Sequence, residues 1–366
     1  MNQKIYNPKH IFWARVFSSF ISPYFIFLNL FRKQYQVSEV EIKKILVTEY
    51  HRIGDVLLIA PAIEKLKNTF PKAQIILICD ENAKDLASNL FLGDDIISFN
   101  APWTNWEWSP IKWYNAYVFA KSFRKRSIDL AIDFKGDVRN GWFLWNIKAK
   151  ISLGYNETGG EYFYTNPKSF YSPTHQTTRA IQLLENIGIV DSDYAYSKTN
   201  YNLDGAVVIH SGATDPRREW PNEKWIQLIK KLSEDRIICI IKVPETLALI
   251  QEAFDAGLRI DTFRGSLIEF KEWLKKQKIL IALDSMPAHL ASFVGTPVVT
   301  LFGSQDPKLT KPLGRMVDVV APEKPCLHNS EHWRLCKKCI ESITVDQVYL
   351  AFKNMETRIN REQNDD

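Results

Sequence analysis

The sequence lacks the features that mark disordered, fibrous or disulfide-rich proteins. Only five of its 366 residues are cysteine, and they form no even, closely spaced framework, so we expect a reducing compartment. The formal net charge of +5 is too small to indicate a nucleic-acid partner, although it suits an anionic substrate or a membrane surface. With 45% hydrophobic and 24% charged residues, the composition is that of a globular protein whose length predicts two domains.

The N-terminal apolar stretch, residues 11–31, has the length of a membrane span but not its uninterrupted composition. Arg15, Ser18 and Pro23 break the apolar run, and no small-residue cleavage site follows it, so we do not expect a signal peptide. Basic residues flank the stretch and aromatic residues fill it, which is typical of a segment in a membrane interface. We therefore predict that residues 1–40 form an apolar, membrane-interfacial segment. A helix packed on its own domain and a true membrane span are the alternatives.

The stretch KILVTEYHRIGD predicts a strand at 45–47 and, after a turn, a helix over 56–70. Gly54 would let the backbone approach a ligand. Asp55 would project from the start of the helix at the carboxyl end of the strand, where open parallel sheets bind their ligands. The alternative is that Asp55 is an ordinary carboxylate favoured by the helix dipole.

The rest of the first half predicts a domain over residues 41–190. Its further strands are expected at 74–79, 96–99 and 128–134. Lys135 and Arg139 follow the last of these strands, so their cations would lie at the edge of the sheet where ligands bind. The aromatic-rich segment 103–117 either faces a membrane or an acceptor, or packs in the core.

A polar, aperiodic segment, residues 191–203, is expected to link two domains. It contains Asp191-Ser192-Asp193, and an Asp-x-Asp pair can hold a divalent metal when it ends a core strand. Because this pair lies in a linker, we interpret it as part of a solvated loop.

A second domain is predicted over residues 204–366, ending in a helix. It begins with a strand at 206–209 and the loop HSGATDPRREWP, in which Arg217 and Arg218 offer forked N–H donors that suit phosphate oxygens. Further strands are expected at 237–241, 279–283 and 298–302, with helices at 223–232 and 270–276. Strands that alternate with helices in both halves predict two doubly wound α/β domains.

The stretch ILIALDSMPAHLASFVGTPVVTLFGSQDP predicts a strand, a helix and a second strand. Four residues would lie at the first strand's end and on the helix turn facing it: Asp284, Ser285, Met286 and His289. The free N–H groups of that turn form an anion site, and Gly303-Ser304 could add a second. We interpret this stretch as a seat for a diphosphate, although capped turns and structural histidines are common in α/β proteins.

Near the C-terminus, potential metal ligands gather within fourteen residues: Cys326, His328, His332, Cys336 and Cys339. The Cys-x-x-Cys spacing is that of zinc ligands, and tetrahedral zinc would need two more from the group. The alternative is a loop of reduced cysteines.

Three stretches, RIGDVLLIAPAIEKLKNTFP, HSGATDPRREWPNEKW and DSMPAHLASFVGTPVVTLFGSQDP, resemble in order and spacing the signature regions of glycosyltransferase family 9, the ADP-heptose:lipopolysaccharide heptosyltransferases. The resemblance runs from about residue 43 to 350. It implies the GT-B fold, in which two Rossmann-like domains face a central cleft, with the acceptor bound by the first and the nucleotide sugar by the second. It also implies inversion at the anomeric centre without a metal, at the cytoplasmic face of the inner membrane.

By this resemblance, Asp55 matches the catalytic base and Arg218 matches a lysine on the donor phosphates. Asp284, Ser285 and His289 match the donor-binding turn, and Glu245 more loosely matches a carboxylate near the nucleoside. The donor-binding residues that we predict are Gly54, Thr214, Arg217, Arg218, Glu245, Asp284, Ser285, Met286 and His289. The chain departs from the family at Met286, where glycine is usual, and at Lys242-Val243-Pro244, where a Gly-rich turn is usual, so the base and sugar of the donor are less firmly implied.

We therefore expect an inverting, metal-independent glycosyltransferase without a cofactor. It would move a heptose or a related sugar from a nucleotide diphosphate, expected to be ADP-heptose, to a lipid-linked saccharide such as lipopolysaccharide core. Lys135 and Arg139 would bind acidic groups of the acceptor. The expected location is cytoplasmic, peripheral at the inner face of the cytoplasmic membrane, with no nucleic-acid partner. The alternatives are a transferase for another nucleotide sugar in surface polysaccharide assembly and a catalytically idle scaffold that binds saccharide or lipid.

Overall fold

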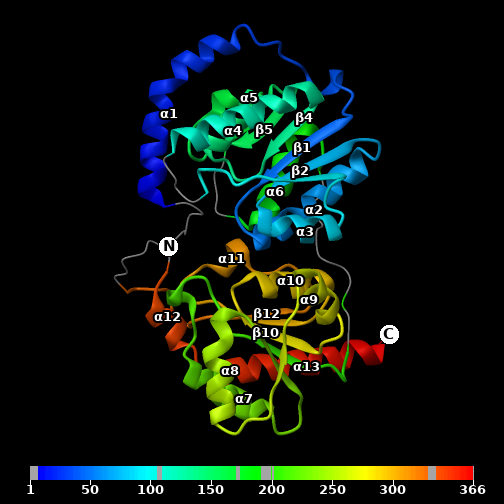
Figure 1. Cartoon of the computed structure of the whole chain (residues 1–366), viewed down its shortest axis with the longest axis vertical. Coiled ribbons are helices and arrows are strands. Elements are labelled where there is room, and N and C mark those ends of the chain that lie inside the picture. The colour runs from blue at the N-terminus through cyan, green and yellow to red at the C-terminus, as the bar shows by residue number, and fades with distance from the viewer. Residues whose placement is uncertain are drawn as a thin grey trace. The chain divides into compact units, whose positions relative to one another are not determined.

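The computed structural model describes residues 7–104, 109–169, 174–190, 199, 202–328 and 335–365. These residues form two compact units, an N-terminal unit within Lys4–Asp193 and a C-terminal unit within Tyr194–Asp366. Each unit contains one sheet of parallel strands with helices on both faces, which confirms the predicted α/β class (Figure 1). Most of the predicted linker, including Asp191 and Asp193, lies outside the described residues.

The sheet of the N-terminal unit has the strand order β3-β2-β1-β4-β5-β6. Its strands are β1 (Lys44–Glu49), β2 (Gln74–Cys79), β3 (Asp95–Ser98), β4 (Leu130–Asp133), β5 (Ile151–Tyr155) and β6 (Asn166–Lys168). The central strands β1, β2, β4 and β5 are almost wholly buried, as expected where helices cover both faces of a parallel sheet. Chain order reverses between β1 and β4, which pair side by side.

Helices cover this sheet in two layers (Figure 1). One layer contains α2 (Ile53–Thr69), α3 (Glu81–Asn89) and α6 (Gln176–Leu184), and the other contains α4 (Pro110–Ser122) and α5 (Val138–Ile147). Short 3₁₀ helices join these elements: η1 (Val37–Glu39), η2 (Phe123–Arg126), η3 (Glu161–Phe163) and η4 (Glu185–Ile187). Trp103 is buried in the core beside Tyr50 and Phe143, so this aromatic residue packs internally. Trp106 and Trp108 lie outside the described residues.

The sheet of the C-terminal unit repeats the same topology, in the order β12-β11-β10-β7-β8-β9. Its strands are β7 (Val207–His210), β8 (Ile238–Ile241), β9 (Asp261–Phe263), β10 (Ile279–Leu283), β11 (Val298–Leu301) and β12 (Val317–Val320). Chain order reverses between the neighbouring strands β7 and β10. These two strands therefore occupy the positions that β1 and β4 occupy in the first sheet.

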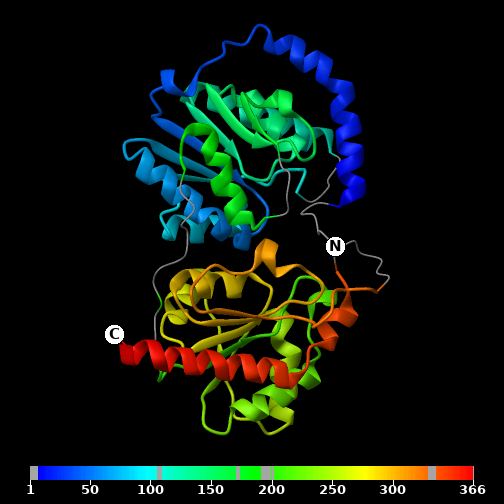
Figure 2. The same ribbon diagram turned by 180° about the vertical axis from the view of Figure 1, so that it is seen from behind.

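Helices again cover both faces of this second sheet, and both views show α13 running along one of them (Figure 2). The helices are α7 (Asn222–Leu232), α8 (Leu247–Asp255), α9 (Leu267–Leu274), α10 (Met286–Val294), α11 (Pro307–Thr310), α12 (Lys337–Ser342) and α13 (Val345–Asp365), with the 3₁₀ helices η5 (Pro216–Arg218) and η6 (Pro244–Thr246). Helix α10, the helix predicted after the strand at 279–283, has Pro287 in its first turn, and Gly295 follows its last residue in the left-handed conformation.

Helix α1 (Pro8–Asn29) packs on the N-terminal unit through polar contacts. Ser18 is buried and bonds the hydroxyl of Tyr162 at 3.0 Å and the N–H of Gly160 at 2.8 Å. Asn29 donates to the carbonyl of Tyr162 at 2.6 Å. By length and composition alone, Lys9–Asn29 is long and apolar enough to cross a membrane. The packed side of α1 fits the predicted alternative of a helix docked on its own domain.

The first residue of helix α2 decides how Asp55 is placed. Helix α2 begins at Ile53, three residues earlier than predicted, because the carbonyl of Arg52 already accepts bonds from the N–H groups of Asp55 at 2.9 Å and Val56 at 3.2 Å. The predicted turn at Gly54 and Asp55 is therefore wrong. Both residues belong to the first helical turn, whose dipole favours a carboxylate.

Candidate active site

In open parallel sheets, ligands bind beyond the carboxyl ends of the strands at the point where the strand order reverses. In the N-terminal unit this point lies between β1 and β4, and in the C-terminal unit it lies between β7 and β10. Asp55 and Lys135 follow the first pair of strands, and Arg218 and Asp284 follow the second. The predicted residues thus fall at the ligand-binding position of each sheet.

Asp55 forms a close ion pair with Lys135 in the N-terminal unit. The Nζ atom of Lys135 donates to Oδ1 of Asp55 at 2.7 Å and to Oε1 of Gln176 at 2.9 Å. It also lies 3.7 Å from Oε2 of Glu49, whose side chain is completely buried. Lys135, predicted to bind the acceptor, is therefore held between two carboxylates, and its acceptor role stays a prediction.

The pair sets the protonation state of Asp55. Burial raises the pKa of this carboxyl, but the charge of Lys135, with smaller contributions from His51 and Arg52, outweighs burial and holds the pKa at about 2. Burial lowers the pKa of Lys135, yet Asp55 and Glu49 outweigh it, so the net pKa lies above its usual value. Asp55 is thus an ionised carboxylate and Lys135 an ammonium at neutral pH.

Arg139 is held within its own turn. Its guanidinium makes a bidentate pair with Asp137, with Nε to Oδ1 at 2.9 Å and Nη2 to Oδ2 at 2.5 Å. Asp137 also caps α5 by accepting the N–H of Arg139 at 2.9 Å. Its predicted contact with the acceptor therefore also stays a prediction.

Arg218 and Asp284 form the corresponding ion pair of the C-terminal unit. Nη2 of Arg218 donates to Oδ2 of Asp284 at 2.6 Å and to the carbonyl oxygen of the same residue. The Nε group of Arg218 is buried and has no hydrogen-bond partner among the described residues, so a donor remains for a ligand. The neighbouring Arg217 is held by Asp215, with Nε to Oδ1 at 2.9 Å and Nη2 to Oδ2 at 2.7 Å.

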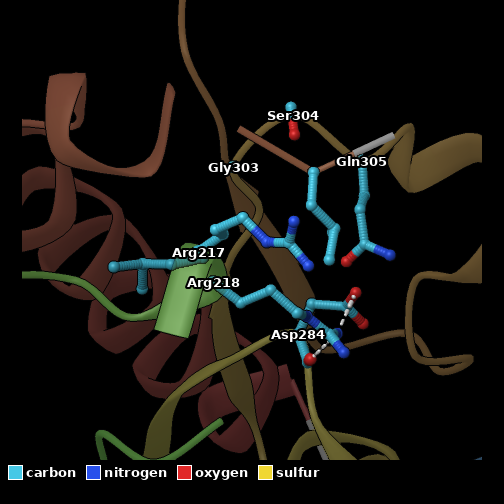
Figure 3. Close-up of a pocket in the computed structure, with 8 residues that line it drawn as sticks. Arg217, Arg218, Asp284, Gly303, Ser304 and Gln305 are labelled. Carbon is cyan, nitrogen blue, oxygen red and sulfur yellow. Dashed lines mark hydrogen bonds and ion pairs between the residues drawn. The ribbon is translucent and has the colours of Figure 1, made fainter. Parts of the chain in front are cut away.

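These side chains line a pocket at the end of the sheet. Figure 3 shows both arginine side chains reaching into it, with Arg218 joined to Asp284. The lining residues are Arg217, Arg218, Asp284, Leu301, Gly303, Ser304, Gln305 and Leu335. Gly303-Ser304, expected as a second anion site, thus lies beside the arginines. No sequence pattern pointed to Leu335, which comes from a loop far along the chain.

Other predicted donor residues lie around this pocket without lining it. Ser285 immediately precedes α10, whose first residue is Met286, and the Ser285 hydroxyl donates to the carbonyl of Leu283 at 3.1 Å instead of capping the helix. His289 is buried, with Nε2 3.9 Å from Oδ1 of Asp284. The side chains of Thr214 and Glu245 are exposed.

Glu245 nevertheless lies against the loop after β7. A Cβ atom on Gly212 would lie 2.8 Å from the Cβ of Glu245, so this close approach requires glycine.

At the end of β7, burial lowers the pKa of His210 to about 4. His210 is therefore neutral at neutral pH, and the positive charge of this region comes from the two arginines.

Comparison with known proteins identifies the class. The structure of a glycosyl transferase family 9 protein from Veillonella parvula DSM 2008 superposes with a TM-score of 0.69 at 18% identity, covering 87% of this chain and 98% of that one. The structure of E. coli heptosyltransferase WaaC with ADP-2-deoxy-2-fluoro heptose gives 0.68 at 19% identity, covering 85% and 99%. The molecule therefore has the GT-B fold of the heptosyltransferases.

Sequence comparison defines the family within that class. The model of glycosyltransferase family 9 (heptosyltransferase) matches residues 116–339, more than half of the chain. Lipopolysaccharide heptosyltransferase 3 of Escherichia coli K12 is 24% identical over 303 residues, which cover 72% of this chain and 83% of that protein. The chain belongs to glycosyltransferase family 9, and it is a glycosyltransferase. The predicted family, fold and enzyme class are confirmed.

Proposed function

We propose that this protein transfers a heptose from a nucleotide diphosphate donor, ADP-heptose or a close analogue, to a hydroxyl of a lipid-linked saccharide such as lipopolysaccharide core, with inversion. The proposal rests on finding an ionised Asp55 at the strand ends of the N-terminal unit and an arginine-lined pocket at those of the C-terminal unit. Inverting transfer needs both a proton acceptor for the attacking hydroxyl and stabilisation of the departing diphosphate. We assign the acceptor to the N-terminal unit and the donor to the C-terminal unit.

Arg217, Arg218 and the turn that begins α10 would hold the diphosphate. Guanidinium groups bind phosphate oxygens through paired N–H donors, and the free N–H groups of a helix N-terminus add to the anion site. The Nε–H group of Arg218 is buried beside Asp284 and has no hydrogen-bond partner in the described part of the chain, which costs free energy. A phosphate oxygen that accepts a hydrogen bond from this group would remove that cost. These cations can neutralise the leaving diphosphate, and we therefore propose that transfer needs no catalytic metal.

Asp55 would accept the proton of the attacking hydroxyl. A carboxylate with a pKa near 2 is too weak a base to ionise a sugar hydroxyl beforehand, so the proton must move as the new bond to the anomeric carbon forms. Lys135 would hold this carboxylate ionised and oriented, and Gln176 and Glu49 would hold Lys135. We also propose that Lys135 and Arg139 bind acidic groups of the acceptor.

The outer surface of α1 fits the interface of a membrane carrying the lipid-linked acceptor. The face of α1 that packs on the N-terminal unit carries Ser18 and the aromatic ring of Phe25. Large apolar side chains are exposed elsewhere on the helix and just after it: Phe12, Trp13, Phe17, Phe20, Tyr24, Ile26, Phe27, Leu30 and Phe31. Lys9 and Lys33 are exposed at its two ends. An exposed apolar surface bounded by cations is typical of helices that lie in the headgroup region of anionic lipid. We propose a peripheral enzyme of the inner face of the cytoplasmic membrane.

The experiment is a donor and acceptor assay on the full chain. Purified protein is incubated with ADP-heptose and a heptose-deficient lipopolysaccharide acceptor, and ADP release and product are measured, with other nucleotide sugars in parallel. We expect ADP-heptose to be turned over only when acceptor is present, at a rate unchanged by added magnesium or manganese. Turnover of a different nucleotide sugar would favour surface polysaccharide assembly, an alternative that Met286 at the start of α10 keeps open. Nucleotide binding without any turnover would favour the idle scaffold.

A further inference from the structure

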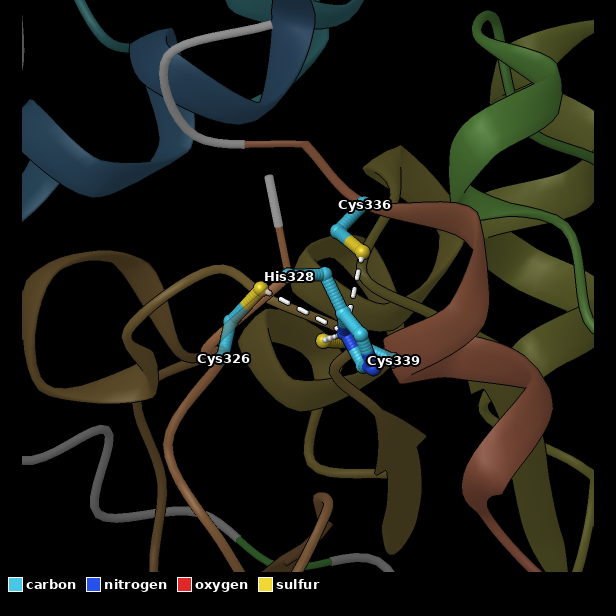
Figure 4. A group of neighbouring side chains, drawn as sticks. All are labelled: Cys326, His328, Cys336 and Cys339. Carbon is cyan, nitrogen blue, oxygen red and sulfur yellow. Dashed lines mark hydrogen bonds between the residues drawn. The ribbon is translucent and has the colours of Figure 1, made fainter. Parts of the chain in front are cut away.

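Four potential metal ligands converge in the loop between β12 and α12 (Figure 4). Cys326 and His328 belong to the loop, Cys336 is the residue before α12, and Cys339 lies in its first turn. Both cysteines at the helix are buried, whereas His328 is exposed. Residues 329–334, which include the predicted alternative ligand His332, lie outside the described residues.

The distances from the histidine nitrogen to the three sulfur atoms match those of a tetrahedral metal site. The Nδ1 atom of His328 lies 3.8, 3.4 and 3.5 Å from the Sγ atoms of Cys326, Cys336 and Cys339. All four ligand atoms lie within 4.8 Å of one another. Zinc at about 2.3 Å from sulfur and about 2.0 Å from nitrogen, with tetrahedral angles, would separate ligand atoms by roughly 3.5 to 3.8 Å.

Hydrogen bonding alone does not account for this arrangement. A single imidazole nitrogen carries either one proton or one lone pair, so Nδ1 of His328 can make one good hydrogen bond. Here it lies at similar distances from three sulfur atoms, and none of the three cysteines is in a disulfide. A cation at the centre would satisfy all four groups at once.

We propose that Cys326, His328, Cys336 and Cys339 bind one structural Zn²⁺ ion. Three thiolates and one imidazole form a closed donor set that favours zinc over magnesium or calcium and leaves no position for substrate. On binding, each cysteine thiol gives its proton to solvent as its sulfur–zinc bond forms, and no electron is transferred. With all four positions filled by protein ligands, the ion would take no part in the transfer itself, so the site is compatible with transfer that needs no catalytic metal.

The zinc site would hold one wall of the donor pocket. Leu335, next to the ligand Cys336, lines that pocket. Ile340, next to the ligand Cys339, packs on Gly303, where an added Cβ would lie 3.1 Å from the Cβ of Ile340. Helix α12 also packs against η5, which carries Arg217 and Arg218. The metal would therefore fix α12 against two sides of the pocket, and this part of the inference depends on the proposed function.

Metal content tests the site without reference to activity. We expect elemental analysis of the full chain to find about one zinc per molecule, and replacement by Co²⁺ to give the absorption spectrum of a tetrahedral thiolate site. Cys336→Ser and Cys339→Ser should lose the metal. His328→Ala tests the same site at an exposed position, where folding is not at risk, and should weaken zinc binding and change the Co²⁺ spectrum. Cys239→Ala, a buried cysteine of β8 outside the cluster, is the matched control and should keep one zinc.

Protein that takes up no zinc and gives no tetrahedral Co²⁺ spectrum would overturn the site, as would cluster variants that keep the full metal content. One iron per chain, lost in the same variants, would overturn the assignment to zinc. We expect His328→Ala to bind ADP several-fold more weakly than wild type. Unchanged ADP affinity in zinc-free protein would overturn the link to the pocket. Failure of wild-type, zinc-loaded protein to bind any nucleotide would instead count against the proposed function.

Discussion

The two units share one strand order and place one ion pair at the same point of that order, but with the charges exchanged. In the N-terminal unit the carboxylate of Asp55 follows the first strand and the ammonium group of Lys135 follows the fourth. In the C-terminal unit Arg218 follows the first strand and Asp284 follows the fourth. The same topology therefore offers two sites of different character.

The surroundings of each pair explain the difference. Lys135 lies between Asp55 and Glu49, so the N-terminal group has more carboxylates than ammonium groups and suits a proton acceptor. In the C-terminal unit a second arginine, Arg217, lies beside the pair, and Arg218 keeps a buried N–H donor. That site suits an anion. Under the proposed function, the fold supplies the position, and the side chains that follow the strands decide whether that position takes a proton or a phosphate.

The largest effect on turnover should come from replacing Asp55, the proposed proton acceptor of the N-terminal unit. Asp55→Asn keeps the shape of the side chain but cannot accept the proton, and we expect turnover to fall by roughly 10² to 10⁴. Glu49, 3.7 Å from Lys135, still balances the lysine charge, so the variant should fold. The measurement is steady-state ADP release. Asp80→Asn, which keeps a cap at the start of α3, is the control. Near-normal turnover in Asp55→Asn would remove Asp55 from catalysis.

The next effect should come from the arginine of the C-terminal unit. Arg218→Ala removes charge-assisted bonds from a partly buried pocket, and we expect ADP affinity to fall by roughly 10- to 100-fold, since such bonds contribute about 1.5 to 3 kcal/mol. Arg218→Lys should restore binding only in part, because an ammonium cannot form the paired contact. Calorimetry gives the affinity, and Arg264→Ala, at an exposed position, is the control. Equal affinity in Arg218→Ala and wild type would refute the assignment.

A smaller effect concerns pH. Because the folded pKa of Asp55 lies near 2, below the ordinary 3.8, the carboxylate stabilises the native state at neutral pH, and this contribution is lost as the pH falls from about 4 through 2. Lys135→Met removes the charge that opposes burial, so the pKa of Asp55 should rise and the acid limb of kcat/KM should move to higher pH.

Lys135→Arg keeps the charge and should keep that limb low. Lys150→Met is the control, since Lys150 pairs with Asp129 at 2.7 Å at the opposite, amino end of the strands. An unmoved acid limb in Lys135→Met would show that Lys135 does not tune the base.

The smallest effect on chemistry should follow changes in α1, a helix that has no counterpart among the described residues of the C-terminal unit. Phe17→Ser, Phe20→Ser and Phe27→Ser together should release the protein from anionic vesicles in a sedimentation assay, because each removes exposed apolar surface. Turnover of a soluble, delipidated acceptor should change little. Phe254→Ser, on α8, is the control and should keep vesicle binding. Vesicle binding that survives the triple change would place the membrane contact elsewhere.

Sequence patterns predicted most of the sheet framework because the central strands are continuous apolar runs. The predicted 74–79 and 279–283 coincide with β2 and β10. The edge strands β6, β9 and β12 were missed, since each is short and only partly buried and so has no clear apolar pattern. Strand β5 was also missed, although it is fully buried, because Ser152 and Gly154 interrupt its apolar residues. Helix α5 was not predicted: the residues after Lys135 were considered only as cations at a strand end, whereas Asp137 caps a helix there.

The sequence was enough to predict which residues belong to the candidate site, but not which of them contact one another. Strand ends and the family motifs singled out Asp55, Lys135, Arg218 and Asp284, yet nothing in their spacing indicated that they pair. Those pairings depend on which strands lie side by side, which a single sequence does not state. Gln176 and Leu335 were missed for the same reason, because they reach the sites from distant segments. Glu49 was missed although it is the last residue of β1, because its contact with Lys135 depends on the pairing of β1 with β4.

The most direct test of the division between the two units is the ADP affinity of Asp55→Asn and Arg218→Ala, measured by calorimetry on proteins of equal zinc content. If the base belongs to the N-terminal unit and the diphosphate to the C-terminal unit, Asp55→Asn should bind ADP within a few-fold of wild type although its turnover is lost. Arg218→Ala should bind ADP at least tenfold more weakly. An Asp55→Asn protein that folds normally but loses ADP binding as severely as Arg218→Ala would contradict the account.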